Sequence, residues 1–148
     1  MTMEEVRMYT DGACEGNPGP GGYAAILDRN GKRTEVTGRE RQTTNNRMEL
    51  LAVIAGLRTL TEPSSVSVVT DSQYVAKGMT TWIHAWRRKG WKTASGSPVK
   101  NRDLWEELDA LGRRHRLRFE WIRGHNGHPE NERADLLARE AIRDPEGV

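Results

Sequence analysis

Two neighbouring segments decide the fold of this chain: Asn45-Asn46-Arg47-Met48-Glu49-Leu50-Leu51 and Val66-Ser67-Val68-Val69-Thr70-Asp71. The first segment opens a helix that we expect to run from Asn45 to Leu60, with Thr44 as its N-cap. Apolar residues lie nearly all round this helix, which is typical of a buried helix. The second segment predicts a short strand that carries Asp71 at its C-terminal end. A strand reached through a crossover helix pairs in parallel, with right-handed connection, with an earlier strand.

The earlier strands precede the helix. Val6 to Thr10 alternates apolar and polar residues, which predicts a strand with one buried face. Residues 11–22 contain so much glycine and proline that we expect no regular structure there. Tyr23 to Asp28 and Lys32 to Thr37 are two further predicted strands, joined by an Asn-Gly turn. The simplest arrangement of these three strands is an antiparallel meander.

The C-terminal half contains one more predicted strand, Leu117 to Ile122, between helices. A short helix is expected over Ser72–Gly78, and a longer one, capped by Asn101, is expected to end near Arg114. Pro129, in the favoured first position, opens a last helix that runs to about Ile142.

Length and composition indicate one small globular domain. The 148 residues are enough to bury a core, and we expect a single domain over residues 1–148 with an ordered core at about 6–142. No apolar run is long enough to span a membrane, and the first residues lack a secretory segment. The lone cysteine, Cys14, excludes an internal disulfide framework and fits a cytoplasmic protein. The net charge of +2 does not by itself indicate a nucleic-acid partner.

Four carboxylates in distinctive local sequences are the candidate catalytic residues: Asp11, Glu49, Asp71 and Asp135. Two follow apolar strands and two lie in helices with apolar residues, where an unpaired charge is disfavoured. If the two strands are parallel neighbours, Asp11 and Asp71 lie side by side and need a cation or a proton. Two Mg²⁺ ions about 3.5–4 Å apart can activate a water and stabilise the leaving oxygen in phosphodiester hydrolysis. Each acid taken singly has a plainer explanation as a turn former, a helix cap or a solvated side chain.

Other polar residues near this edge are candidates for proton transfer and substrate contact. His125 lies in a glycine-bearing loop before the last helix and could move a proton, whereas His128 is expected to be a structural cap. Five amide and hydroxyl residues flank the edge in sequence: Asn17, Thr44, Asn45, Asn46 and Gln73. Such groups can hydrogen-bond sugars, base edges or phosphates, and the alternative is that they satisfy backbone groups in turns.

Aromatic and cationic residues are interleaved from Trp82 to Lys92, and residues 84–100 contain no acid. Cations bind phosphates and flat rings contact sugars or bases, so Trp82 and Trp86 are candidate nucleic-acid contacts. Because these two rings are four residues apart, they share one face of a helix, and packing in the core is the alternative.

Taken in order, these motifs resemble those of type 1 ribonuclease H, and specifically of the bacterial ribonuclease HI enzymes. The resemblance extends from about Val6 to Ile142 and rests on these segments: Tyr9–Cys14, Gly16–Gly19, Thr44–Leu50, Thr70–Val75, Gly90–Thr93, Pro98–Asn101 and Trp121–Asp135. It implies an α/β, ribonuclease H-like fold, with a five-stranded mixed sheet, antiparallel in its first three strands and then parallel, flanked by helices on both faces.

The resemblance also implies an activity, which is hydrolysis of the RNA strand of RNA–DNA hybrids by in-line attack of water, leaving 5′-phosphate and 3′-hydroxyl ends. It implies Mg²⁺, with Mn²⁺ as a substitute and two ions when substrate is bound, held by Asp11, Glu49, Asp71 and Asp135. His125 would assist proton movement or product release.

Substrate contacts follow from the same resemblance. Glu49 and the loop from Cys14 to Asn17 would sense ribose 2′-hydroxyls, which distinguish RNA from DNA. The remaining contacts would be made by Asn45, Asn46 and Gln73 in the minor groove, by Thr44 and Asn101 at a DNA phosphate, and by Trp82 and Trp86 along the DNA strand.

Two departures from the bacterial pattern affect binding. Ala94-Ser95-Gly96-Ser97 is less basic than expected, so hybrid binding should be weaker or more salt-sensitive. No additional hybrid-binding domain is present in the sequence, which predicts low processivity in a monomer without an obligate protein partner. A non-catalytic hybrid-binding module should lack at least one carboxylate, and a DNA strand-transferase would need further domains.

Overall fold

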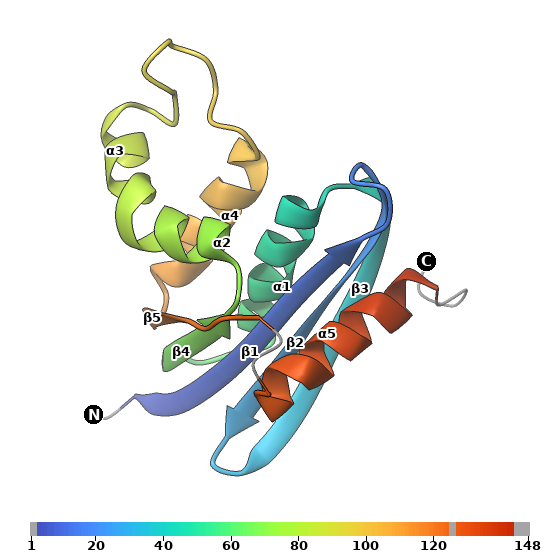
Figure 1. The fold of residues 1–148 in the computed structure, drawn as a ribbon. Helices are drawn as coiled ribbons and strands as arrows, with labels where there is room; N and C mark the ends of the chain where they lie inside the picture. Colours follow the sequence, from blue (N-terminus) through green and yellow to red (C-terminus); the bar gives the residue numbers. More distant parts are fainter. Residues whose placement is uncertain (1–2, 125–126, 144–148) are drawn as a thin grey trace.

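The computed structural model describes residues 3–124 and 127–143. In this part of the chain five strands form one mixed sheet in the order β3-β2-β1-β4-β5 (Figure 1). The strands are β1 (Glu4–Cys14), β2 (Gly19–Arg29), β3 (Lys32–Thr43), β4 (Ser64–Thr70) and β5 (Arg116–Trp121). The first three pair antiparallel, and β4 pairs in parallel with both β1 and β5. The predicted mixed sheet and the parallel crossover are therefore confirmed.

The helices lie on both faces of the sheet. They are α1 (Asn45–Arg58), α2 (Gln73–Lys77), a π-helical turn η1 (Gly78–Trp82), α3 (Ile83–Arg88), α4 (Arg102–Gly112) and α5 (Pro129–Ile142). Helix α1 covers one face, with α4 beside it, and α5 crosses the other face (Figure 1). No helix in the described ranges is long and apolar enough to cross a membrane.

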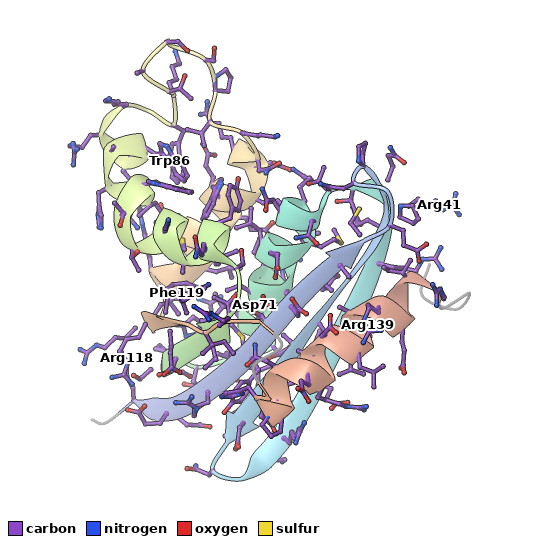
Figure 2. The ribbon with its side chains drawn as sticks, viewed as in Figure 1. Arg41, Asp71, Trp86, Arg118, Phe119 and Arg139 are labelled. Carbon is purple, nitrogen blue, oxygen red and sulfur yellow. The ribbon has the colours of Figure 1, made fainter. Side chains whose placement is uncertain are left out.

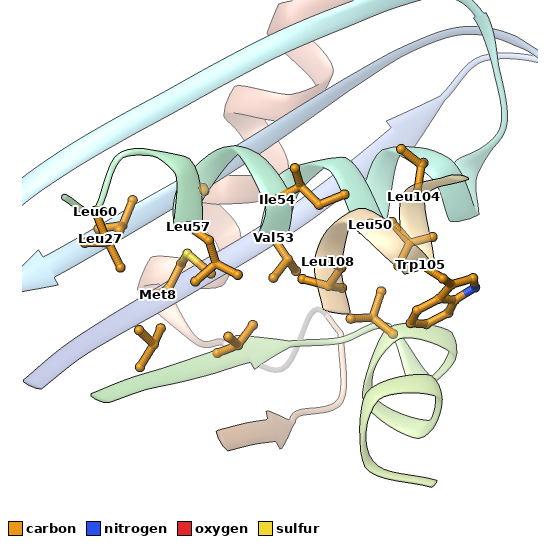
Figure 3. Close-up of a cluster of buried hydrophobic side chains, with 14 of the residues drawn as sticks. Met8, Leu27, Leu50, Val53, Ile54, Leu57, Leu60, Leu104, Trp105 and Leu108 are labelled. Carbon is orange, nitrogen blue, oxygen red and sulfur yellow. The ribbon is translucent and has the colours of Figure 1, made fainter. Parts of the chain in front are cut away.

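The main core lies between the sheet and helices α1 and α4. Figure 3 shows it, with Met8 and Leu27 from the sheet, a row of aliphatic residues along α1, and Leu104, Trp105 and Leu108 from α4. Helix α1 is buried along most of its length, as its all-round apolar pattern predicts. Thr44 is its N-cap and accepts a hydrogen bond from the Arg47 amide at 3.3 Å. A smaller cluster under α5 joins Tyr9, Ile26, Val69 and Ala134.

The expectation of no regular structure over residues 11–22 is wrong. Strand β1 continues to Cys14 and β2 begins at Gly19, so only residues 15–18 connect them. Glycines within the two strands serve close packing, whereas Gly16, with φ 77°, lies in the connection. A Cβ on Gly12 would lie 2.5 Å from the Glu49 amide nitrogen, and one on Gly22 would lie 2.2 Å from the Ala138 carbonyl oxygen. Glycine in these strands therefore lets α1 and α5 approach the sheet on its two faces.

Other predicted boundaries also change. Strand β3 extends to Thr43, beyond the predicted Thr37, because it follows the longer β2 through their antiparallel pairing. Asn101 stands before α4 with a left-handed backbone (φ 60°), but its side chain makes no capping hydrogen bond. His128 likewise precedes α5 without capping it through its side chain. The Asn101 side chain instead forms hydrogen bonds with other helices, and the His128 ring lies beside that of Tyr9.

Candidate active site

Three of the four predicted carboxylates meet at one edge of the sheet. Asp11, Glu49 and Asp71 each offer an oxygen, and these oxygens lie within 4.8 Å of one another. The parallel register explains the first contact, because β1 and β4 are paired as far as Tyr9 and Val69. Asp11 and Asp71 stand two residues beyond that pair. Glu49 reaches them because α1 packs directly against Gly12.

Asp11 is not at the end of its strand, as the sequence suggested, but three residues before it. Strand β1 continues with β2 as its partner, whereas β4 ends at Thr70. The sheet therefore separates at this point, and the carboxylates occupy the gap between the continuing strand and the departing one. This is the ligand-binding position typical of α/β sheets, at the carboxyl ends of the parallel strands.

The chain around Asp71 is held by several hydrogen bonds. The Thr70 hydroxyl accepts from the Ser72 amide at 3.0 Å, and the Ser72 hydroxyl accepts from the Val75 amide as the N-cap of α2. The indole nitrogen of Trp121, at the end of β5, donates to the Asp71 carbonyl oxygen at 2.9 Å. Figure 2 shows Asp71 where β4 gives way to the segment that leads into α2.

Burial and mutual repulsion favour the protonated forms of these acids. Desolvation, followed by the negative charges of Asp71 and Asp135, raises the pKa of Asp11 to about 8. Desolvation also raises the pKa of Glu49 well above its usual range, with Asp11 and Asp71 adding to the effect. The Oε1 atom of Glu49 is buried and has no hydrogen-bond partner among the described residues. A cation in this cluster would relieve the repulsion and satisfy that oxygen.

The cluster fits a hard divalent cation. All three side chains offer carboxylate oxygen, the ligand type that Mg²⁺ and Mn²⁺ prefer over nitrogen and sulfur. Asp11 and Glu49 are each only 6% exposed, so folding has already removed most of the water around these two carboxyl groups. Three carboxyl groups so close together, two of them buried, fit a site for such a cation.

Asp135 lies beside the cluster and does not belong to the group of three. Its negative charge helps to raise the pKa of Asp11, and its Oδ2 accepts from Arg139 Nε at 3.1 Å along the same helix. Asp135 lines a small cavity together with Asp11 and Asp71. Its side chain is about one-quarter exposed, which leaves it accessible from this cavity.

His128 lines the same cavity, and this corrects its predicted role as a cap. Its ring lies 5.8 Å from the Tyr9 ring, and its buried Nδ1 has no hydrogen-bond partner in the described part of the chain. Asn131, one turn into α5, also lines the cavity. His125, the predicted proton carrier, lies outside the described residues.

The predicted substrate contacts next to the cluster form a connected surface. Asn17 Oδ1 accepts from the Asn45 amide at 2.8 Å, which ties the β1–β2 connection to the start of α1. The Cys14 thiol is directed at the carbonyl oxygens of Gly19 and Thr43, at 3.6 Å and 3.4 Å. Asn45 and Asn46 are half-buried at the N-terminus of α1. Gln73 is exposed at the start of α2.

A second network, which the sequence did not reveal, joins α1, α2 and α4. Arg47 forms a paired contact with Asp103, at 3.0 Å and 2.8 Å, and also donates to Asn101 Oδ1 at 3.3 Å. The Tyr74 hydroxyl accepts from Asn101 Nδ2 and from Trp105 Nε1, both at 3.0 Å. Asn101 is thus a bridge between helices, which explains why it does not cap α4.

The two predicted tryptophan contacts have different environments. Trp82 is 37% exposed, and its ring lies 6.0 Å from those of Tyr74 and Trp86. Trp86 is half-buried, packs against the core and lies 5.1 Å from the Trp105 ring. In Figure 2 its side chain points from α3 toward α4. Trp86 therefore packs against the core, as the alternative expected, whereas Trp82 is accessible, and contact of either ring with nucleic acid stays a prediction.

The cations near these rings also differ. Arg87 Nε donates to the buried Asp109 at 3.0 Å, so this guanidinium is engaged in a structural ion pair. Arg88 and Lys89, next in sequence, are exposed. The sequence counted all of these cations as phosphate ligands, and it gave no signal that Asp109, on a different helix, would engage one of them.

Comparison with known proteins places the whole chain in one family. The family model described as RNase H matches residues 3–143. The protein is 56% identical to a ribonuclease H from Thiobacillus denitrificans, over 96% of each chain. It is 58% identical to a ribonuclease H from Paramagnetospirillum magneticum, over 95% of this chain and 92% of that one.

Solved structures agree with this placement. LC9-RNase H1, described as a type 1 RNase H with the type 2 active-site motif, superposes with a TM-score of 0.89 at 35% identity, over 100% of this chain and 75% of that one. LC11-RNase H1, solved in complex with an RNA/DNA hybrid, superposes with a TM-score of 0.70 at 26% identity, over 93% of this chain and 96% of that one. The sheet, the carboxylate edge and these matches agree, and the chain belongs to the ribonuclease H family.

Proposed function

We propose that this protein is an endoribonuclease that hydrolyses the RNA strand of RNA–DNA hybrids at the edge formed by Asp11, Glu49 and Asp71. The observation that carries the proposal is the meeting of three carboxylate oxygens within 4.8 Å, two of them from buried residues, at the carboxyl edge of parallel strands. The relatives named ribonuclease H and the LC11-RNase H1 structure, which contains a hybrid, support the substrate.

Asp11, Glu49 and Asp71 would hold Mg²⁺, or Mn²⁺ in its place, with two ions present when substrate is bound. Asp135, adjacent to Asp11, would complete the ligand set. Divalent ions in such a site supply an activated water and neutralise charge on the leaving oxygen. His125 would move a proton. The products would carry 5′-phosphate and 3′-hydroxyl ends.

The substrate surface would extend on both sides of the carboxylates. Glu49 and the segment from Cys14 to Asn17 would contact ribose 2′-hydroxyls, the groups that identify RNA. The minor groove would be contacted by Asn45, Asn46 and Gln73. A DNA phosphate would lie between Thr44 and Asn101, and Trp82, with Trp86 behind it, would face the DNA strand beside exposed Arg88 and Lys89.

The proposed cellular setting is simple. We infer a monomer formed by one domain, active in the cytoplasm and without an obligate protein partner. Size-exclusion chromatography with light scattering tests the oligomeric state, and a dimer at micromolar concentration would refute that part of the proposal.

A panel of substrates tests the proposed activity. The protein with Mg²⁺ is incubated with an end-labelled RNA–DNA hybrid and, separately, with an RNA duplex, a DNA duplex and single-stranded RNA. We expect cleavage only of the RNA strand of the hybrid, and its loss when EDTA is added. Binding to the hybrid without cleavage in either Mg²⁺ or Mn²⁺ would overturn the enzyme assignment and favour a hybrid-binding module.

A further inference from the structure

Trp121 is an exposed aromatic residue in contact with the backbone of a candidate metal ligand. It is the last residue of β5 and is 43% exposed, which is unusual for so large an apolar ring. Its indole N–H donates to the Asp71 carbonyl oxygen at 2.9 Å, across 50 residues of sequence. The indole N–H is the only hydrogen-bond donor of this ring, and it is bonded to Asp71. Core packing does not explain this position of a partly exposed ring.

The position of this bond in the sheet shows what it does. The pairing of β4 with β5 ends at Thr70 and Trp121, and the last backbone bond runs from the Ile122 amide to the Thr70 carbonyl at 2.9 Å. Helix α2 begins only at Gln73, with Ser72 as its cap. Asp71 therefore lies between the end of one regular element and the start of the next. The Trp121 indole supplies a donor to its carbonyl where the β-ladder has ended.

The segment that follows β5 also leaves room for the carboxylate of Asp71. A Cβ on Gly124 would lie 2.8 Å from Asp71 Oδ2, so glycine at this position leaves room for the carboxylate. The end of β5 and the segment after it thus meet Asp71 twice, at the carbonyl through Trp121 and at the carboxylate through Gly124.

We propose that Trp121 is a positioning residue, whose indole N–H fixes the Asp71 main chain so that the Asp71 carboxylate faces Asp11 and Glu49 before a metal binds. The proposal rests on the metal site of the proposed function. The bond is a single contact between neutral groups at the surface, so its loss should have little effect on global stability. Partners that orient metal ligands from outside have larger effects on metal affinity, typically about 10-fold or more.

The test is a Mg²⁺ titration of the protein without substrate, followed by two-dimensional ¹H–¹⁵N NMR. Trp121→Phe keeps an aromatic ring and removes the donor. Trp91→Phe is the matched control, because Trp91 is another partly exposed tryptophan, and its ring packs beside that of Trp86 in the aromatic cluster. The Gly12 amide, adjacent to Asp11 in β1, reports Mg²⁺ binding in all three proteins.

We expect the dissociation constant for Mg²⁺ to rise about 10-fold in Trp121→Phe and to stay within twofold in Trp91→Phe, with melting temperatures close to that of the wild type. In the wild type, the indole N–H resonance that Trp121→Phe lacks should shift together with the Gly12 amide as Mg²⁺ is added. This second measurement is made on the wild type, and the variant is needed only to assign the resonance.

The outcomes separate the two proposals. Wild-type binding of Mg²⁺ with an unchanged dissociation constant in Trp121→Phe, or with an indole resonance that does not respond, refutes the role of Trp121 and leaves the metal site intact. A Gly12 amide that does not respond to Mg²⁺ in the wild type refutes the metal site of the proposed function, and the role of Trp121 falls with it.

Discussion

Replacing Asp11 with asparagine should stabilise the metal-free protein, and the gain should increase with pH. The Asp11 carboxyl is 6% exposed, and desolvation followed by the charges of Asp71 and Asp135 raises its pKa from 3.8 to about 8. In the unfolded chain the carboxyl returns to its ordinary value. Between about pH 4 and pH 8 the folded protein therefore binds more protons than the unfolded chain, and the free energy of unfolding falls as pH rises.

The size of the effect follows from the pKa values. One pKa unit corresponds to about 1.4 kcal/mol, so the full shift of Asp11 would correspond to about 6 kcal/mol above pH 8. Relaxation and entry of water lower such costs in real proteins, and we expect Asp11→Asn to add about 2–4 kcal/mol at pH 8.5. At pH 4.5, where Asp11 is protonated in the folded state, asparagine is nearly its isostere and the gain should be below about 1 kcal/mol.

The assay is urea unfolding in EDTA from pH 4.5 to pH 8.5, with the wild type and Asp11→Asn measured side by side. The comparison removes the contribution of His115, whose pKa is lowered by burial and which changes stability in the opposite direction as pH rises. Glu62→Gln is the control, because Glu62 is exposed and distant in the fold from the cluster. A difference between wild type and Asp11→Asn that is constant over this pH range, or a variant less stable at pH 8.5, would refute the electrostatic argument.

Three further predictions concern the metal, the helix network and the basic surface. At pH 8, Mg²⁺ at 100 times its dissociation constant should raise the wild-type free energy of unfolding by about 2.7 kcal/mol, and EDTA should reverse this in a melting experiment. Tyr74→Phe leaves two donors without their acceptor and should cost about 1–3 kcal/mol in urea unfolding, and a smaller loss would show that water replaces the hydroxyl. Arg88→Ala should weaken hybrid binding and reduce its salt slope by about 1, measured by fluorescence anisotropy, at nearly unchanged stability. Arg87→Ala should instead destabilise the fold by about 1–3 kcal/mol, because the buried Asp109 loses one of its two arginine partners; equal behaviour of the two variants would contradict this distinction.

Much of the fold was predictable because its signals are local. The all-round apolar pattern of α1, the Thr44 cap and the apolar run before Asp71 each depend on neighbouring residues, and the structure contains all three. The parallel crossover follows from their order along the chain. These elements bring Asp11, Glu49 and Asp71 together at the predicted edge.

The errors arise where a contact between distant residues decides the structure. A segment rich in glycine and proline predicts a loop, but Gly12 and Gly22 lie in strands. The helices α1 and α5 pack so closely there that no side chain would fit. Asn101 looks like a helix cap, and Arg47 and Tyr74 from other helices take its side chain instead. No pattern in β5 indicates that its last residue holds the Asp71 carbonyl.

Asp135 shows how far a motif alone can be taken. The sequence assigned it the same standing as the other three acids, but in the structure it contacts Asp11 and the neighbouring Arg139 and stays outside the tight group. Its part in the ligand set therefore remains a proposal, which the same Mg²⁺ titration of Asp135→Asn can test.

The most direct test of the account is hybrid cleavage by Asp71→Asn beside the control Glu62→Gln, with enzyme in excess over an end-labelled RNA–DNA hybrid in Mg²⁺ and hybrid binding measured in parallel. The account predicts that Asp71→Asn still binds the hybrid but cleaves it at least about 1000-fold more slowly than the wild type, a loss of about 4 kcal/mol in transition-state stabilisation, whereas Glu62→Gln is unchanged. Cleavage by Asp71→Asn within tenfold of the wild-type rate would contradict the claim that the carboxylate cluster carries the reaction.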